Sequence, residues 1–281
     1  MSSASVGWST RLGALHGVVR ARLLQALLGK HAIGVLFDTK NGLIVVPSHD
    51  DTFSNRLGKY GASDETALTE LLSLVDATSR VLVVGAHLGV LAIPLAKKVE
   101  RCVAIEANPD TFRFLQMNVA LANLRNMTLH NVAASNENGD LRFVLSRSNS
   151  GGSKREPKHK DYVYYADDPK TVSVPAVVLD ELLEGQTFDL VIVDIEGSEY
   201  FALQGMKRIL SSCRNLHIEY VAHHVERVAG VDDEAFLSLL RPHFSTGRVS
   251  GTSRVVVESE FRELVGALKT DGGGDLLFSK S

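Results

Sequence analysis

An apolar strand, a glycine turn, a helix and a second apolar strand follow one another in the segment VLVVGAHLGVLAIPLAKKVERCVAIEANP. Val81–Val84 is an unbroken apolar run, as expected of a parallel strand that is covered on both faces. Gly85 and Gly89 bracket the turn, where the missing Cβ atoms let a ligand approach the backbone. Glu106 ends the second strand, twenty-one residues after Gly85. Such a βαβ unit predicts a nucleoside site, in which the carboxylate accepts hydrogen bonds from ribose hydroxyls.

The glycine spacing distinguishes between two nucleoside cofactors. A dinucleotide site favours G-x-G-x-x-G, whereas this chain has glycines only at the ends of Gly85-Ala86-His87-Leu88-Gly89. S-adenosylmethionine (SAM) carries an adenosine ribose but no pyrophosphate, so a looser glycine pattern is sufficient for it. The spacing therefore favours SAM over NAD. A tight turn without any ligand would give the same two glycines, and only the acid at the matching distance argues against that interpretation.

Composition limits the partners that the chain can have. Its 281 residues include 44% hydrophobic and 22% charged residues, which is enough apolar material for one large domain with N-terminal additions. The net charge of −3 gives no overall electrostatic reason to expect nucleic acid as a partner. The only cysteines, Cys102 and Cys213, lack metal-ligand spacing, so we expect buried free thiols and a cytoplasmic location.

Residues 1–64 are predicted to form an N-terminal helix and a β-hairpin. The helix carries an apolar face with three- and four-residue steps, made of Leu12, Leu15, Val19, Leu23 and Leu27. Basic residues interrupt every apolar run, so no transmembrane segment is predicted. We expect this helix to pack on the domain or on a second subunit of a homodimer, in preference to a membrane surface. Asn41-Gly42 between two apolar runs predicts the hairpin.

Residues 65–281 alternate helical and strand patterns, which predicts a Rossmann-like α/β fold with helices on both faces of a parallel sheet. Asn108-Pro109 marks a helix start, because asparagine caps helices and proline suits their first turn. The segment at about 146–170 has no apolar period and is predicted to be an inserted loop. The expected strands after the βαβ unit are Met127–His130, Leu141–Leu145, Val172–Val178, Phe188–Val193, Leu216–Val221 and Asp275–Phe278.

Carboxylates follow the apolar strand FDLVIVDIEGSE. Ligands of open α/β sheets bind beyond the carboxyl ends of the strands, so Asp194 should face the same crevice as Gly85 and Glu106. Asp194 could orient a substrate hydroxyl or act as its general base. Glu196 and Glu199 could join Asp194 in substrate binding, or they could stabilise the start of the next helix.

Two histidines and a basic loop are further candidates. His223 and His224 follow the strand HIEYV and could accept a proton near neutral pH. With Asp194 and Glu219 they could also form a metal site, but no paired spacing such as H-x-x-x-H is present, so no metal is predicted. Lys154 and Arg155 follow glycines in the inserted loop and could clamp an anionic substrate, although a solvated loop would have the same composition.

The ordered set of motifs resembles the FkbM family of SAM-dependent methyltransferases. The family pattern D-V-G-A-N-x-G corresponds here to residues 83–89, its E-P-N-P motif to Glu106-Ala107-Asn108-Pro109, and its K-I-D-x-E-G-x-E block to residues 192–199. Departures from the pattern are Val83 in place of the acid, His87 in place of the asparagine, and Ile192 in place of the lysine. The resemblance covers roughly Glu65 to Tyr220.

The resemblance implies a class I methyltransferase sheet and methylation of a hydroxyl on a sugar or secondary metabolite. It implies that residues Gly85, Ala86, His87 and Gly89 hold the methionine end of SAM, with Glu106, Ala107 and Asn108 at the ribose. It also implies that Asp194 lies near the transferred methyl group. The residues leave two alternatives open: a non-catalytic binding protein on this scaffold, motivated by Val83 and Ile192, and an NAD(P)-dependent oxidoreductase, motivated by the βαβ unit.

Overall fold

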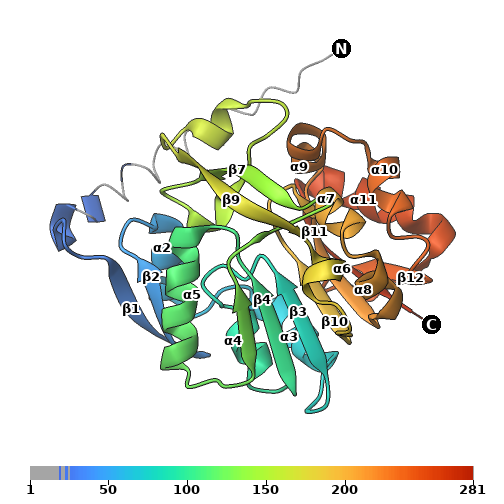
Figure 1. The fold of residues 1–281 in the computed structure, drawn as a ribbon, viewed down its shortest axis with the longest axis horizontal. Coiled ribbons are helices and arrows are strands. Elements are labelled where there is room, and N and C mark those ends of the chain that lie inside the picture. Colours follow the sequence, from blue (N-terminus) through green and yellow to red (C-terminus); the bar gives the residue numbers. More distant parts are fainter. Residues whose placement is uncertain (1–18, 20–22, 25, 281) are drawn as a thin grey trace.

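The largest sheet has the parallel strands of the predicted fold. In this computed structural model, which describes residues 19, 23–24 and 26–280, the sheet order is β13-β12-β14-β11-β10-β3-β4-β5 (Figure 1). Its parallel strands are β3 (Arg80–Val84), β4 (Arg101–Ile105), β5 (Met127–His130), β10 (Leu190–Val193) and β11 (Asn215–Tyr220). β3, β5, β10 and β11 were predicted within two residues at either end, and β4 was predicted to end at Glu106. The Rossmann-like fold class is confirmed.

An antiparallel strand, β14 (Gly274–Ser279), follows β11 in the sheet. It also pairs with β12 (Thr246–Val249), which in turn pairs with the short β13 (Val256–Val257). A dinucleotide-binding sheet would continue with a sixth parallel strand at this place. The antiparallel strand therefore argues against the oxidoreductase alternative, and it brings its amino-terminal end to the edge where the parallel strands have their carboxyl ends.

Helices cover both faces of the sheet, as predicted. The side chains of Leu82 and Val84 belong to one apolar core, and those of Val81 and Val83 belong to the other. The first core is covered by α6 (Leu179–Leu182), α7 (Glu199–Gln204), α8 (Lys207–Ser212), α10 (Asp233–Ser238) and α11 (Phe261–Asp271). The second is covered by α3 (Glu65–Ser73), α4 (Ala92–Ala96) and α5 (Pro109–Leu121). The alternation along β3 thus divides the interior into two layers.

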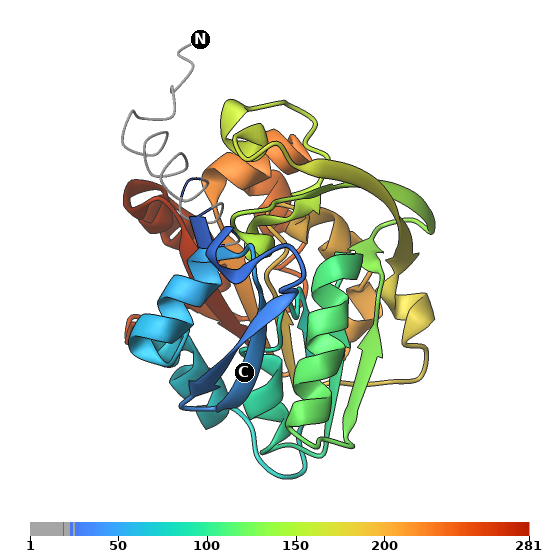
Figure 2. The same cartoon turned by 90° about the vertical axis from the view of Figure 1, so that its left-hand side faces the viewer.

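The predicted hairpin is formed by β1 (Gly34–Thr39) and β2 (Gly42–Pro47), and it lies against α5 (Figure 2). Asn118 of α5 accepts a hydrogen bond from Val45 N and donates to Val45 O and Leu88 O. The next segment, 51–60, is a helix, α2, which the sequence analysis missed. Its N-cap is Asp50 and its C-cap is Gly61 in the left-handed region.

The predicted apolar face of the N-terminal helix is only partly visible, because Leu12 and Leu15 lie outside the described residues. Val19, Leu23 and Leu27 are 49%, 59% and 86% exposed. The homodimer that this face suggests stays a prediction. Within the described part of the chain, no helix has the length and apolar character needed to span a membrane. Cys102 and Cys213 are buried free thiols, as expected.

A second sheet, of order β6-β9-β7-β8, lies over the carboxyl edge of the main sheet (Figure 1). It contains β6 (Ala133–Ser135), β7 (Gly139–Leu145), β8 (Lys154–Arg155) and β9 (Lys170–Val178). The inserted segment 146–170 therefore has structure of its own, which includes β8 and two short 3₁₀ turns, η1 (Ser150–Gly152) and η2 (Tyr162–Tyr165). This segment forms a roof over the candidate site.

Candidate functional site

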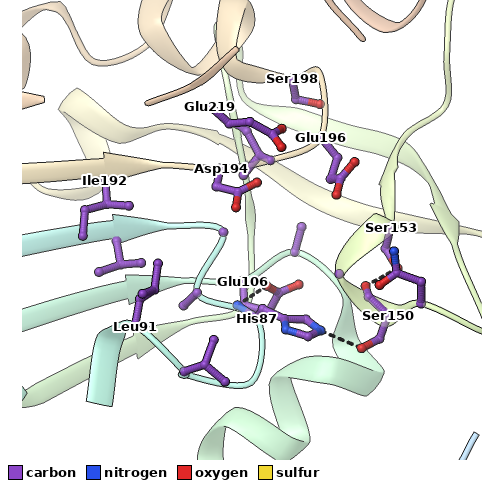
Figure 3. A pocket seen from close by; sticks show the side chains of 18 of the residues that line it. His87, Leu91, Glu106, Ser150, Ser153, Ile192, Asp194, Glu196, Ser198 and Glu219 are labelled. Atoms are coloured by element: carbon purple, nitrogen blue, oxygen red, sulfur yellow. Dashed lines mark hydrogen bonds between the residues drawn. The ribbon is translucent and has the colours of Figure 1, made fainter. Parts of the chain in front are cut away.

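A cavity of about 350 Å³ lies where the carboxyl ends of β3, β4, β10 and β11 meet (Figure 3). This is the place where open α/β sheets bind their ligands. The predicted site residues that line it are Gly85, Ala86, His87, Glu106, Ala107, Asp194 and Glu196. The structure does not place the other predicted site residues in the lining of this cavity: Gly89, Asn108, Lys154, Arg155, Glu199, His223 and His224.

The glycine turn has a backbone that few side chains allow. Gly85 and Gly89 have φ values of +90° and +89°, and His87 between them has +50°. The amides of Gly85 and Ala86 both donate to Ile105 O, which fixes the turn to β4. A Cβ at Gly85 would overlap the carbonyl oxygen of Asp194 and would lie 2.8 Å from its carbonyl carbon. The turn is therefore held against both neighbouring strands.

Glu106 is oriented by two backbone amides. His87 N donates to one carboxylate oxygen and Asn108 N to the other, each over 2.8 Å. The residue is 8% exposed, and burial raises the pKa of its carboxyl to about 7, against the two amide hydrogen bonds, which lower it. Each carboxylate oxygen keeps a second lone pair, so Glu106 can still accept hydrogen bonds from a ligand.

His87 is joined to the roof of the site. Its Nε2 lies 2.6 Å from Ser150 Oγ, and the Ser150 hydroxyl donates to Asp50. Ser150 Oγ must then accept from His87 Nε2–H, so Nδ1 carries no proton. Burial lowers the pKa of His87 to about 3, and the ring is neutral. The sequence analysis did not predict a role for Asp50 or Ser150 in the site. Asp50 was recognisable as a helix N-cap, because an aspartate before the acidic first turn of α2 is a helix-start signal.

Carboxylates gather on the other side of the cavity. Asp194 and Glu196 follow β10, Glu219 comes from β11, and Asp275 lies at the start of β14. Asp194 lines the cavity and is exposed within it. Desolvation by the surrounding protein, together with the nearby Glu219 and Glu196, raises the pKa of its carboxyl well above the usual range. Asp275 was missed as a site residue because only the antiparallel direction of β14 brings the strand's beginning to this edge.

The remaining candidate residues lie near these four carboxylates. Glu199 is 3% exposed and accepts a hydrogen bond from Ile195 N, so it stabilises the turn and does not face the cavity. His224 Nδ1 lies 3.6 Å from Glu196 and 3.9 Å from Glu219, whereas His223 Nε2 lies 3.6 Å from Asp161. Burial is the main cause that lowers the pKa of both imidazoles.

The two basic residues of the roof point to different places. Lys154 is 6% exposed, and its Nζ lies 3.1 Å from Glu196 and 4.7 Å from the Tyr164 ring centroid. The Arg155 guanidinium stacks over Phe201, with 4.0 Å to the ring centroid, outside the cavity wall. Lys154 is thus within reach of the site, and Arg155 is engaged elsewhere.

Comparison with known families agrees with the motif resemblance. The family model of the methyltransferase FkbM domain matches residues 84–245, which is more than half of the chain. The chain belongs to the FkbM methyltransferase family. Its match begins at the last residue of β3 and extends beyond α10, so it includes the glycine turn, Glu106 and three of the four carboxylates, Asp194, Glu196 and Glu219. No curated protein gives a significant match.

Solved structures similar to this FkbM-family chain have low sequence identity. The methyltransferase FkbM from Methylobacillus flagellatus KT is 16% identical, with 73% of this chain and 44% of that chain covered and a TM-score of 0.40. Precorrin 8W decarboxylase from Methanobacterium thermoautotrophicum is 13% identical, with coverages of 78% and 91% and a TM-score of 0.44. Precorrin-6y C5,15-methyltransferase from Geobacter metallireducens GS-15 is 11% identical, with coverages of 80% and 95% and a TM-score of 0.41. This chain thus spans less than half of the FkbM structure that it resembles.

Two departures from the FkbM pattern lie side by side. Val83 of β3 and Ile192 of β10 are register partners in parallel strands, are 2% and 1% exposed, and both line the cavity. Side chains at paired positions of neighbouring strands point to the same face. Where the family pattern has an acid and a lysine, this FkbM-family protein therefore has an apolar contact.

This pairing predicts a non-additive effect on stability. Val83→Asp alone is expected to lower the free energy of unfolding by about 3 kcal/mol or more, because it buries a charge without a partner. Ile192→Lys alone should be similarly costly, and the double variant should lose less than the sum of the two. Urea unfolding of the three variants and the wild type measures the coupling. Additive losses would show that the two side chains do not interact.

Proposed function

We propose that this protein is a SAM-dependent methyltransferase that methylates a hydroxyl of a neutral small molecule, such as a sugar. The observation that carries the proposal is Glu106, a buried carboxylate that two backbone amides hold at the end of β4 with lone pairs free for ribose hydroxyls. Family membership supports the same reaction class.

SAM would lie along the cavity from β5 towards β10. Its ribose would bind Glu106, and its adenine would contact the apolar residues of the same wall, which include Ala107, Ala133, Leu141 and Phe143. Its methionine part would lie along the turn from Gly85 to Gly89. The sulfonium would then come near Asp194, whose backbone amide donates to Val84 O and fixes the end of β10 beside the turn.

Methyl transfer at this place needs a base and an aligned acceptor. The acceptor oxygen would attack the methyl carbon in line while the carbon–sulfur bond breaks, and that electron pair would stay on sulfur as S-adenosylhomocysteine forms. Asp194 would take the hydroxyl proton, and positioning would supply most of the rate. Its raised pKa brings the carboxylate closer to the basicity that this role requires at neutral pH.

Charge on the acceptor side favours a neutral acceptor over an anionic one. Asp194, Glu196, Glu219 and Asp275 line this part of the cavity, and Lys154 already contacts Glu196. An anionic acceptor would be repelled by these carboxylates, whereas hydroxyl groups of a polyol could donate hydrogen bonds to them. This arrangement therefore favours the sugar over the anionic metabolite.

SAM affinity is expected to depend on pH through Glu106. Ribose hydroxyls donate to the ionised carboxylate, and the carboxyl of the free protein has a pKa of about 7. Binding must then displace a proton below that pH, so affinity should rise with pH, with Kd about 10-fold higher at pH 6 than at pH 8. Isothermal calorimetry with SAM over this range measures the change.

Two glutamate-to-glutamine variants distinguish the loss of the ribose contact from the mere loss of a negative charge. Glu106→Gln should weaken SAM binding by about 10- to 100-fold and remove most of its pH dependence. Glu100→Gln is the matched control, because Glu100 is exposed and pairs with Arg80 outside the cavity wall. Equal affinity for SAM in Glu106→Gln and the wild type would refute the proposed ribose contact.

A further inference from the structure

Three side chains that could bind a metal meet on the acceptor side of the cavity. Glu196, Glu219 and His224 each offer a ligand atom, and these atoms all lie within 4.8 Å of one another. His224 Nδ1 is 3.6 Å from Glu196 Oε2 and 3.9 Å from Glu219 Oε2. Separations of this size leave room for an ion at roughly 2.0–2.5 Å from each atom. The sequence analysis considered His224 and Glu219 as possible ligands but not Glu196, because the three residues come from a helix, a strand and a separate turn that no spacing relates.

Two buried polar atoms at this place have no hydrogen-bond partner among the described residues. His224 Nδ1 is buried and makes no hydrogen bond, although two carboxylates lie beyond hydrogen-bond distance on either side. Ser198 is 6% exposed, its Oγ also has no hydrogen-bond partner, and it lines the same cavity as Glu196 and Glu219 (Figure 3). Buried polar atoms in proteins are normally satisfied, so unsatisfied ones around a cavity indicate a missing ligand.

Local backbone geometry brings these side chains together. Glu196 has φ +56°, a conformation that costs energy for a residue with a Cβ. The next residue, Gly197, has φ +98°, and a Cβ there would lie 2.7 Å from Val228 Cβ and 2.9 Å from His224 Cβ. The turn after β10 therefore packs closely against α9 (Ala222–His224) and η3 (Val225–Ala229), which keeps His224 beside Glu196.

The ammonium of Lys154, in place of a metal ion, could balance the charge of this cluster. This ammonium lies 3.1 Å from Glu196 Oε2 and balances one negative charge. Glu219 and Asp194 line the same cavity, and Asp194 accepts no hydrogen bond from the described residues. When ionised together, the three carboxylates carry more negative charge than one ammonium balances, and a divalent ion would neutralise the excess.

We propose that Glu196, Glu219 and His224 form a divalent-cation site on the acceptor side of the cavity. One imidazole and two carboxylates suit Mn²⁺ or Zn²⁺ better than Mg²⁺ or Ca²⁺, which prefer oxygen ligands alone. The role of the ion rests on the proposed function: it would hold and polarise the acceptor hydroxyl beside Asp194. Ser198 would donate a hydrogen bond to a water or an acceptor oxygen on the ion.

Direct metal binding tests the site without any acceptor. The full chain, stripped with EDTA, is titrated with MnCl₂ and with ZnCl₂ by calorimetry, and bound Mn²⁺ is counted by electron paramagnetic resonance. We expect one ion per chain. Glu219→Gln and His224→Gln should each weaken binding by about 100-fold or more, since even residues behind metal ligands contribute about 10- to 100-fold. His223→Gln is the matched control, because His223 contacts Asp161, and it should bind like the wild type.

Lys154→Gln distinguishes the metal from the built-in ammonium. With the ammonium gone, Glu196 is free, and metal affinity should rise. Two results would overturn the inference. One is that the wild type binds neither metal at about 1 mM, even if Lys154→Gln binds one of them. The other is that His224→Gln binds metal as tightly as the wild type. SAM titrated in EDTA gives a separate result, because Glu106 and the glycine turn lie outside the cluster. Metal binding without SAM binding would refute the proposed function alone, and SAM binding without metal binding would refute the metal site alone.

Discussion

Gly85→Ala is expected to prevent stable folding, with a loss of more than about 4 kcal/mol in the free energy of unfolding. The new Cβ would overlap the backbone carbonyl of Asp194, at the end of a central strand, and would lie 3.0 Å from Ile195 Cγ2. The turn cannot move away from Ile105, nor Asp194 away from Val84, without breaking backbone hydrogen bonds that join β3 to β4 and β10. Urea unfolding, or the yield of folded protein when the variant is too unstable to titrate, measures the effect.

Gly272→Ala is the matched control for backbone strain. Gly272 ends α11 with φ +87°, almost the same as the +90° of Gly85, but a Cβ there would meet no atom within 4 Å. Its substitution should cost only about 1–2 kcal/mol, the strain of a left-handed residue. Equal losses for the two variants would show that strain alone, and not the contact with Asp194, requires glycine at position 85.

Asp194→Asn is expected to lower kcat for methyl transfer by about 10²- to 10⁴-fold, because the amide cannot take the acceptor proton. SAM affinity should stay within about threefold, since the ribose contact at Glu106 is unchanged. Production of S-adenosylhomocysteine from SAM, with sugars and other polyols as acceptors, measures the rate. In the wild type the raised pKa of Asp194 should make the rate fall on acidification at a higher pH than an ordinary aspartate would allow.

Asp189→Asn is the control at the opposite end of the same strand. Asp189 accepts a hydrogen bond from Arg80 N and pairs with Arg214, outside the cavity wall, so its variant should keep the wild-type rate. An unchanged rate in Asp194→Asn would exclude this residue as the base. A wild type that binds SAM but methylates none of these acceptors would favour the alternative of a non-catalytic binding protein, as suggested by the apolar pair Val83 and Ile192.

Local patterns were sufficient to predict the centre of the fold. The apolar run before Gly85 and the cap at Asn108-Pro109 predicted β3 and the start of α5, because both signals depend on neighbouring residues. β8 and β13 have only two residues each, so they show no periodicity, and they exist because β7 and β12 offer them a partner. The missed α2 is polar on much of its surface, and its signals were only its two caps.

The site residues that stand at the ends of predicted strands could be predicted from the sequence. Those that reach the site from distant segments could not. Glu106 and Asp194 end their strands, so the rule for parallel sheets placed them at one edge. Asp50, Ser150 and Asp275 reach that edge from distant segments, and no spacing in the sequence relates them. The same limit explains why the absence of an H-x-x-x-H pattern led to no metal prediction, although His224 lies beside Glu196 and Glu219 in space.

The position of β14 also determines when the sheet can be completed during synthesis. β14 separates β11 from β12, and it pairs with both along their length. Until residues 274–279 leave the ribosome, the backbone groups of β11 on that side have no partner, and β12 and β13 cannot join the sheet. An unpaired strand edge readily pairs with another chain. The nascent protein therefore carries an unpaired, aggregation-prone edge through the synthesis of more than fifty residues after β11.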